Sequence, residues 1–467
     1  MAVSIPNTKV KGRRICGALC ALLALLAATP ALAAKPLTAD QIRVYESANE
    51  SQRVHFLIER AKMGQWQLVE TLLQHYPLQG PHAINRTLFI HGLDLEAQGD
   101  LTGAATTFRA ALARDPSLTL VRLQLAQCLE KLGQDDSAKH HVQLLEADAP
   151  NDEVAGALRS FMDRIDAKRP LTFSGFVSMA PSTNINSGSS HTKVYTPAFG
   201  SDVYFDINAT DQKQSGTGLA TGLSAGYSKR LGNHLEAVLA ADISGNIYAN
   251  GSNQSASLSQ SLEMRYHMNN GYVGVGGVAD QSFFAKPNDV IASQLGYHSY
   301  GPRVSMLRFI GDHNTLHASA VYQWRDYVGS TLLDGTAFLS EASFNHGFDS
   351  TFNMTVSGGY DKVNSNQKNL SYGTYFAGFG AYKELPLGIT VNANAQARFS
   401  TFDGENPIFL ETRQDQRYVG SVALTKRDFN FNGFAPTLSY SYTRNVSNIA
   451  IYDYDDHAVN FRLTKDF

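Results

Sequence analysis

The sequence predicts an N-terminal α-helical domain of tetratricopeptide repeats, followed by a C-terminal transmembrane antiparallel β-barrel of about 14 strands. Three observations support this prediction: an export signal at the start, a 34-residue periodicity in the next segment, and alternating apolar and polar residues from about residue 171 onward. We therefore divide the chain into a signal peptide (1–34), a helical domain (35–169) and a barrel (170–467).

The composition narrows the fold class. Charged residues make up 17% of the chain and aromatic residues 10%, with 21 Tyr and 25 Phe against 2 Trp. After residue 34, no segment is apolar for long enough to form a membrane helix. This composition suits a barrel that is apolar outside and wet inside. Taken alone, it suits a large soluble β-protein equally well.

The first 34 residues have the features of a secretory signal peptide. A positively charged start precedes an apolar core from Ile15 to Ala28, and Ala31-Leu32-Ala33 supplies small residues for cleavage. We favour an ordinary secretory signal over a twin-arginine signal at Arg13-Arg14. Lipidation at Cys20 is rejected because too little apolar core precedes this residue.

Removal of this signal would change both the cysteine content and the charge. Cys128 would remain as the single cysteine, so no intramolecular disulfide could form. The four cations of the signal would also go, which leaves 35 basic residues against 42 acidic ones, a net charge of −7. This balance argues against nucleic acid as a partner, because nucleic acid requires a basic face.

Residues 40–167 repeat with a period of 34, which is the period of tetratricopeptide repeats. Small residues recur where the two helices of a hairpin must cross closely, and prolines recur where the second helix ends. We predict helical hairpins at 85–116 and 119–150, an earlier degenerate hairpin at about 51–77, and a capping helix at 151–165. The recurring pairs are Gly99 and Gly133, Ala104 and Ala138, Phe108 and Val142, and Pro116 and Pro150.

Such a stack presents a concave face that binds extended peptides or proteins, and we favour this role over that of a spacer beside the barrel. His140 and His141 are adjacent in the sequence, and adjacent helical residues do not share a face. We therefore expect these two histidines on the solvated surface rather than in a metal site. Cys128 is expected to pack between helices.

From residue 171 the apolar period changes to two, which is the period of a β-strand. Apolar and polar residues alternate without a break from Ile389 to Ser400. A membrane barrel turns its apolar face to lipid and its polar face to a wet lumen. The glycine-rich run 271–277 is interpreted as a closely packed strand, not as a nucleotide-binding loop. Charges on the polar face include Glu263, Arg265, Arg325, Arg398, Arg417 and Arg462.

Short and long connections alternate along the barrel segment. Six short and seven long connections delimit fourteen strands, and an even count brings both barrel ends to the side of the helical domain, which we place in the periplasm. A linker at 166–170 is too short to carry that domain away from the barrel. We expect short connections at 232–233, 269–271, 311–313, 347–349, 386–387 and 430–433, and long ones at 181–218, 249–256, 283–292, 328–334, 362–369, 402–412 and 446–456.

Two stretches resemble the surface lipoprotein assembly modulator (Slam) family. They are Leu438–Phe467 and Gly175–Asn186, the latter with the signature Ala180-Pro181-Ser182-Thr183-Asn184-Ile185-Asn186. The order of signal, tetratricopeptide repeats and fourteen-stranded barrel is also similar. The resemblance implies an outer-membrane translocator that delivers specific proteins, such as surface lipoproteins or secreted haem- or metal-acquisition proteins, to the cell surface. It points to no individual functional residue.

The expected partners follow from these assignments. Alternating apolar residues that close on the terminal Phe467 are the usual signal for the outer-membrane barrel assembly machinery. We therefore expect that machinery, outer-membrane lipid and a protein cargo as partners, and no nucleic acid.

The sequence shows no Gly-x-Ser-x-Gly elbow, no phosphate-binding glycine loop and no zinc-ligand spacing. We therefore do not expect an enzyme, and we predict no catalytic, cofactor-binding or metal-binding residue and no cofactor. Two other functions remain open, a polysaccharide exporter and a solute porin. Exporters of that kind usually carry many more repeats, and a porin has no reason to carry a repeat domain.

Overall fold

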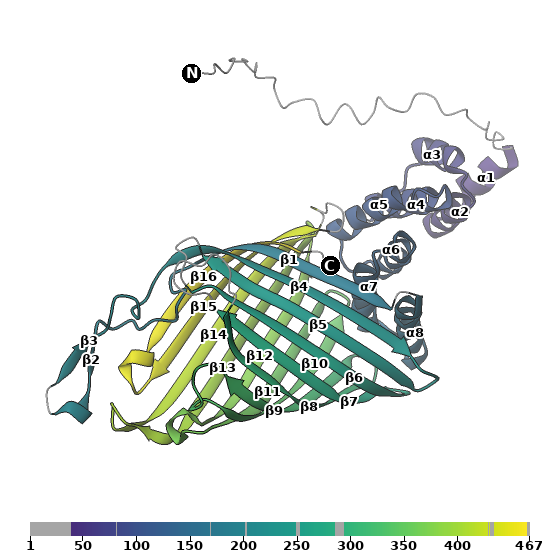
Figure 1. Ribbon diagram of the computed structural model, residues 1–467. Coiled ribbons are helices and arrows are strands. Elements are labelled where there is room, and N and C mark those ends of the chain that lie inside the picture. The colour runs from purple at the N-terminus through teal and green to yellow at the C-terminus, as the bar shows by residue number, and fades with distance from the viewer. Residues whose placement is uncertain are drawn as a thin grey trace, which may run out of the picture.

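The computed structural model describes residues 39–464, apart from 81, 169, 201–202, 249–252, 285–293, 428 and 430–433. Within these residues, a stack of eight α-helices precedes a closed barrel of fourteen strands (Figure 1). The helix-then-barrel order and the strand count predicted from the sequence are confirmed. The predicted signal peptide and the terminal Phe467 lie outside the described residues.

The helices pair into hairpins as the 34-residue period predicts. None of the helices in the described part of the chain is long and apolar enough to span a membrane. Their bounds are α1 Ala39–Ser47, α2 Glu50–Lys62, α3 Trp66–His75, α4 Ala83–Ala97, α5 Leu101–Arg114, α6 Thr119–Leu132, α7 Asp135–Glu146 and α8 Asp152–Lys168. The degenerate hairpin is therefore α2–α3, and the capping helix is α8. The predicted linker at 166–170 is shorter than expected, because α8 continues to Lys168 and the first strand begins at Leu171.

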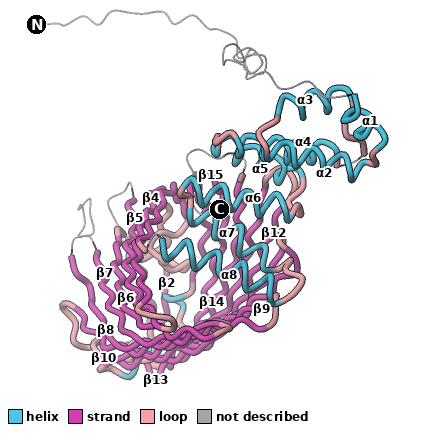
Figure 2. The backbone as a smooth tube through the Cα atoms, turned by 90° about the vertical axis from the view of Figure 1, so that its right-hand side faces the viewer, coloured by secondary structure: helices cyan, strands magenta, loops and turns pink. Residues whose placement is uncertain are grey.

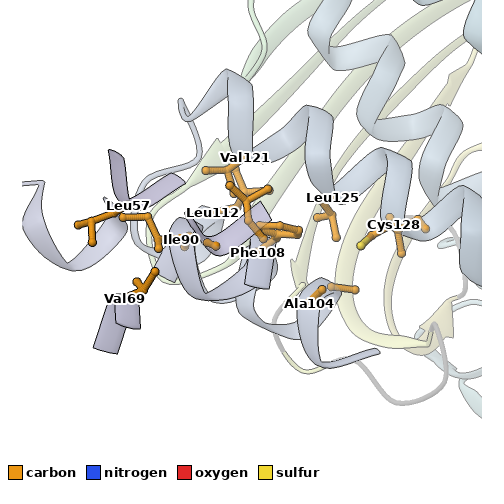
Figure 3. Close-up of a cluster of buried hydrophobic side chains, with 14 of the residues drawn as sticks. Leu57, Val69, Ile90, Ala104, Phe108, Leu112, Val121, Leu125 and Cys128 are labelled. Atoms are coloured by element: carbon orange, nitrogen blue, oxygen red, sulfur yellow. The ribbon is translucent and has the colours of Figure 1, made fainter. Parts of the chain in front are cut away.

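One apolar core runs through the helices (Figure 3). The Phe108 side chain lies fully buried at its centre, and a β-carbon on Gly92 would overlap the Phe108 ring. This close crossing explains why α4 has glycine at that position. Cys128 is buried in the same core, between helices as predicted, and its thiol is free.

The barrel strands pair with their sequence neighbours, and β1 closes the ring by pairing with both β4 and β16. Apolar side chains on the outer face are open to the surroundings: Leu235, Leu239, Ile243 and Ile247 of β5 are 41–52% exposed. The bounds are β1 Leu171–Ser182, β4 Gly216–Arg230, β5 Leu235–Tyr248, β6 Ser255–Met268, β7 Gly271–Phe284, β8 Gln294–Ile310, β9 Asn314–Tyr327, β10 Gly335–Asp349, β11 Phe352–Ser365, β12 Tyr372–Leu385, β13 Ile389–Asn406, β14 Glu411–Lys426, β15 Ala435–Ser447 and β16 Tyr454–Thr464.

Within the described residues, the predicted connections hold with two differences. The one predicted at 430–433, and parts of those at 249–256 and 283–292, lie outside the described residues. The connection expected at 402–412 is mostly strand, because β13 continues to Asn406 and β14 begins at Glu411. The connection expected at 347–349 lies at 350–351. All the short connections lie at one end of the barrel, here called the short-turn mouth, and the loops at 183–215, 328–334, 366–371, 407–410 and 448–453 lie at the other, the long-loop mouth.

The loop between β1 and β4 contains a small hairpin that the sequence did not predict. Its strands are β2 Lys193–Tyr195 and β3 Tyr204–Asp206. Val194 and, just after β3, Ile207 pack with Phe409 and Ile449 from two other loops of the long-loop mouth. These contacts tie three loops together on the side of the barrel opposite the helices.

Candidate functional site at the short-turn mouth

Helices α7 and α8 lie across the short-turn mouth, whereas α1–α3 extend away from the barrel (Figures 1 and 2). Asp163 of α8 forms an ion pair with Arg230 at the end of β4, at 3.0 Å. The Arg159 guanidinium of α8 lies 4.1 Å from the centre of the Phe309 ring of β8. These contacts reach strands on different sides of the ring, so the helix pair covers part of the opening.

The α5–α7 part of the repeat domain also binds the short turns through main-chain groups. The backbone N–H of Ser350 donates to Oδ1 of Asp148 at 3.1 Å. The backbone N–H of Gly388, in the β12–β13 turn, donates to the carbonyl of Ala113 at 3.3 Å. Backbone amides of the buried turns thus donate to acceptors of the repeat domain, which satisfies polar groups that docking removes from water.

A buried ion-pair cluster of Arg122, Glu384 and Arg427 joins the two domains. Arg122 of α6 and Glu384 of β12 have fully buried side chains. Arg122 Nη2 donates to Oε2 of Glu384 at 2.5 Å and to the carbonyl of Pro116 at 2.6 Å, and Nη1 lies 3.3 Å from Oε1. Arg427, just after β14, approaches Glu384 at 2.7 Å. A carboxylate that accepts from two guanidiniums is geometrically well fixed, so the cluster sets the position of α6 against the barrel.

The two adjacent histidines lie in this interface, so the expectation that they are solvated was wrong. His141 is buried, with Nδ1 3.4 Å from Nη1 of Arg122. His140 is half-buried, and its Nε2 lies 3.2 Å from the hydroxyl of Tyr382. The helix does turn the two rings to different neighbours, but α7 is enclosed by the barrel on one side and by α6 on the other. The structure brings them together with charged groups rather than with water.

Burial sets the protonation of both histidines. It lowers the pKa of His140 to about 4, although the Glu384 carboxylate acts in the opposite direction. The pKa of His141 is lowered well below its usual value by burial first and by the nearby Arg122 second, with His140, Arg109 and Arg427 adding to the effect. Both imidazoles are therefore neutral at neutral pH. Across the described part of the chain, no three His, Cys, Asp or Glu residues are grouped closely enough to hold a metal ion.

Burial acts in the opposite direction on an acid nearby. It raises the pKa of Glu146, near the end of α7, to about 7, and Arg159 only partly offsets the shift. The Arg159 Nε lies 3.4 Å from Oε1 of Glu146. The Glu146 carboxyl group is therefore partly protonated at neutral pH, although the Arg159 guanidinium lies beside it.

Cavities flank the helix pair and continue into the lumen. One of about 600 Å³ lies between α7–α8 and the β4–β6 wall. Another of about 480 Å³, here called the mouth cavity, lies between α7–α8 and the β8–β13 wall. A third of about 420 Å³, here called the lumen trough, follows strands β11–β14 inside the barrel. The polar side chains of the lumen trough include Thr355, Ser357, Asn392, Asn394, Gln396 and Ser421.

The opposite wall of the lumen is charged and internally paired. Glu263 of β6 lies 2.6 Å from Nε of Arg265 and 3.6 Å from Nε of Arg303. On the other side of the ring, Arg398 of β13 pairs with Asp361 at 2.6 Å, beyond the lumen trough toward the long-loop mouth. The lumen-facing charges that the sequence predicted at Glu263, Arg265 and Arg398 therefore each have a partner of opposite charge inside the barrel.

Sequence reasoning missed the buried ion-pair cluster. Its signal was present but weak: Arg122 follows Val121 in the apolar stripe of α6, where a charge requires a partner. Nothing local identifies that partner, because Glu384 resembles many other residues at a strand end.

Comparison with known proteins agrees with this architecture. The surface lipoprotein assembly modifier family matches residues 172–467, and a tetratricopeptide repeat matches residues 95–160. The chain belongs to the surface lipoprotein assembly modifier family. The resemblance drawn from the sequence is thus confirmed, and the barrel is an outer-membrane barrel.

Relatives match almost the whole chain at low identity. The hemophilin secretion modulator of Acinetobacter baumannii is 23% identical, with 92% of this chain and 88% of that protein covered. Surface lipoprotein assembly modifier 2 of Haemophilus influenzae is 22% identical, with 90% and 87% covered. A solved FadL homologue of Pseudomonas aeruginosa aligns over 68% of this chain and 95% of its own at 11% identity, with a TM-score of 0.35, which is too low to support an inference.

Proposed function

We propose that the protein is a translocator that carries specific proteins across the outer membrane to the cell surface. Family membership supports this class of function, and so do relatives named for the secretion of hemophilin and the assembly of surface lipoproteins. The observation that carries the proposal is the docking of a protein-binding repeat stack directly across one mouth of a membrane barrel. Such a stack would hold cargo next to the lumen at high effective concentration.

The proposal includes an orientation. The short-turn mouth and the repeat domain face the periplasm, and the long-loop mouth faces the exterior. Residues 1–34 act as the export signal, the barrel assembly machinery inserts the barrel, and outer-membrane lipid contacts its apolar outer face. In this proposal the protein catalyses no reaction and needs no cofactor.

Comparison of surface proteins before and after deletion of the protein tests this function. We expect deletion to remove one or a few specific proteins from the surface, and re-expression to restore them. Loss of a surface polysaccharide or of small-solute uptake, with an unchanged set of surface proteins, would refute the proposal in favour of an exporter or a porin.

The role of the repeats needs a variant that keeps the mouth contacts. Helices α6–α8 hold the docked interface. In the described part of the chain, α1–α3 form no hydrogen bond or ion pair with the barrel, and they lie apart from it in both views (Figures 1 and 2). Removal of α1–α3 should leave an inserted, heat-modifiable barrel but reduce export sharply. Export at the wild-type rate would show that these helices do not recognise cargo.

A further inference from the structure

The lumen trough differs chemically from the rest of the barrel interior. No charged side chain is among the described residues that line it. Carboxamides of Asn392, Asn394 and Gln396 stand at every second position of β13, so they share the lumen face. Across the register, Asn394 lies opposite Gly380 on β12 and Ser421 on β14. These two small neighbours leave the Asn394 carboxamide room on both sides.

The three carboxamides are not used by the protein itself. In the described part of the chain, the side chains of Asn392, Asn394 and Gln396 form no hydrogen bond with another protein group. The polar groups of the facing wall are used: Glu263 binds Arg265, and Asp280 accepts from Ser259 at 2.6 Å. One wall of the lumen therefore offers free carboxamide donors and acceptors, whereas the carboxylates of the other wall, Glu263 and Asp280, are held in internal pairs.

The lumen trough is also continuous with the docked helices. Asn353, Tyr382 and Asn392 line both the mouth cavity and the lumen trough. His140 of α7 and Ala147, just after α7, line the mouth cavity on its other side. A chain held by the repeat domain beside α7 would therefore reach the lumen along β11–β14 before it met the charged wall.

The chemistry of the lumen trough fits an unfolded polypeptide backbone. Each carboxamide has two donors and an acceptor, so it can bind a passing N–H or C=O whatever the side chain. Because the lumen trough carries no net charge, it neither attracts nor repels acidic or basic segments of the cargo. Carboxamides two residues apart on a strand lie about 7 Å apart, which is also the repeat of an extended chain.

We propose that the lumen trough is the surface along which cargo polypeptide crosses the barrel, in an extended and unfolded form. This inference rests on the proposed translocator function and adds the route, the state of the cargo and the residues that contact it. It also predicts that the charged β6–β8 wall does not contact cargo.

Site-specific photo-cross-linking in cells tests the route. A photoreactive amino acid replaces Asn394 or Gln396 in the full-length protein, and the matched control replaces Ser261, a half-buried neutral residue on the lumen face of β6. The probe is the protein whose surface exposure is lost on deletion. Each variant must first show heat-modifiable migration, and the Ser261 control must also show wild-type surface export of that probe. If the Asn394 variant fails to insert, Ser421 on the other side of the trough replaces it.

We expect adducts with the probe at positions 394 and 396 and no adduct at position 261. Equal adducts on both walls, adducts at position 261 alone, or no adduct on either wall while export continues would each overturn the route. These results would leave the translocator function intact. That function fails on a different observation, a set of surface proteins that does not change when the protein is deleted.

Discussion

Replacing Arg122 with Met should weaken the docking of α6–α8 on the barrel without unfolding either part. Methionine keeps an unbranched apolar stem but removes the guanidinium. Removal of one partner from a buried ion pair typically costs about 3–5 kcal/mol, because the other charge is left uncompensated. Here Glu384 retains Arg427 at 2.7 Å and the hydroxyl of Tyr382 at 2.9 Å. For Arg122→Met we therefore expect a cost at the lower end of this range, about 3 kcal/mol. A loss of that size raises the undocked population about 100-fold.

The complementary change should be more damaging. Glu384→Gln removes the only carboxylate of the buried ion-pair cluster and leaves the guanidiniums of Arg122 and Arg427 close together with no counter-charge. We expect the upper end of the range, about 5 kcal/mol. The geometry thus predicts that Glu384→Gln weakens docking more than Arg122→Met does.

Hydrogen exchange of the backbone amides of α6 and α7 measures this docking, because local opening limits the exchange. The matched control is Arg86→Met, which removes the same side chain from the exposed pair with Glu50 in the same domain. Exposed pairs contribute about 0–1 kcal/mol, so exchange in α6 and α7 should stay at the wild-type rate. Equal exchange in the Arg122 and Arg86 variants would refute the claim that the cluster holds the domains together.

Three further predictions concern pH, topology and barrel closure. Docking should weaken as pH falls from about 6.5 towards 4, because His140 and His141 bind protons more readily once they leave the interface, so the undocked state takes up protons in this window; pH-independent exchange of α7 there would contradict this. A tag in the loop 207–215 should be labelled on intact cells and one at 269–270 should not, and the reverse result would invert the orientation. Membrane-inserted protein should migrate differently on gels before and after boiling, as a closed barrel does, and identical migration would argue against closure.

The parts of the fold that the sequence predicted correctly are those that depend on local periodicity. The repeat of 34 residues fixes which faces of α4–α7 are apolar, and Ala104, Phe108 and Ala138 are all fully buried in that core. Period-two alternation fixes the two faces of each strand, so the strand count follows once the turns are recognised.

Strand ends were predicted less well, for a physical reason. The segment 402–412 contains Asp403, Gly404 and Asn406, which are typical of turns, yet most of it is strand. The backbone of β13 beyond Thr401 continues to pair with β14 after a register shift, at Glu405 with Thr412 and Asn406 with Glu411. Pairing beyond the membrane span satisfies backbone groups that turn propensity alone would leave to water.

The pairing across the interface could not be predicted from the sequence, because its partners are distant in the chain. Arg122 and Glu384 are 262 positions apart. Arg122 gives only a weak local signal and Glu384 gives none, because an arginine in an amphipathic helix and a glutamate at a strand end both usually extend to solvent. Arg122 and Glu384 can be buried only together, when the domains dock, because either charge buried without its partner would be destabilising. His140 and His141 were misjudged for the same reason, because a helix face that is polar in isolation becomes interior once a barrel covers it.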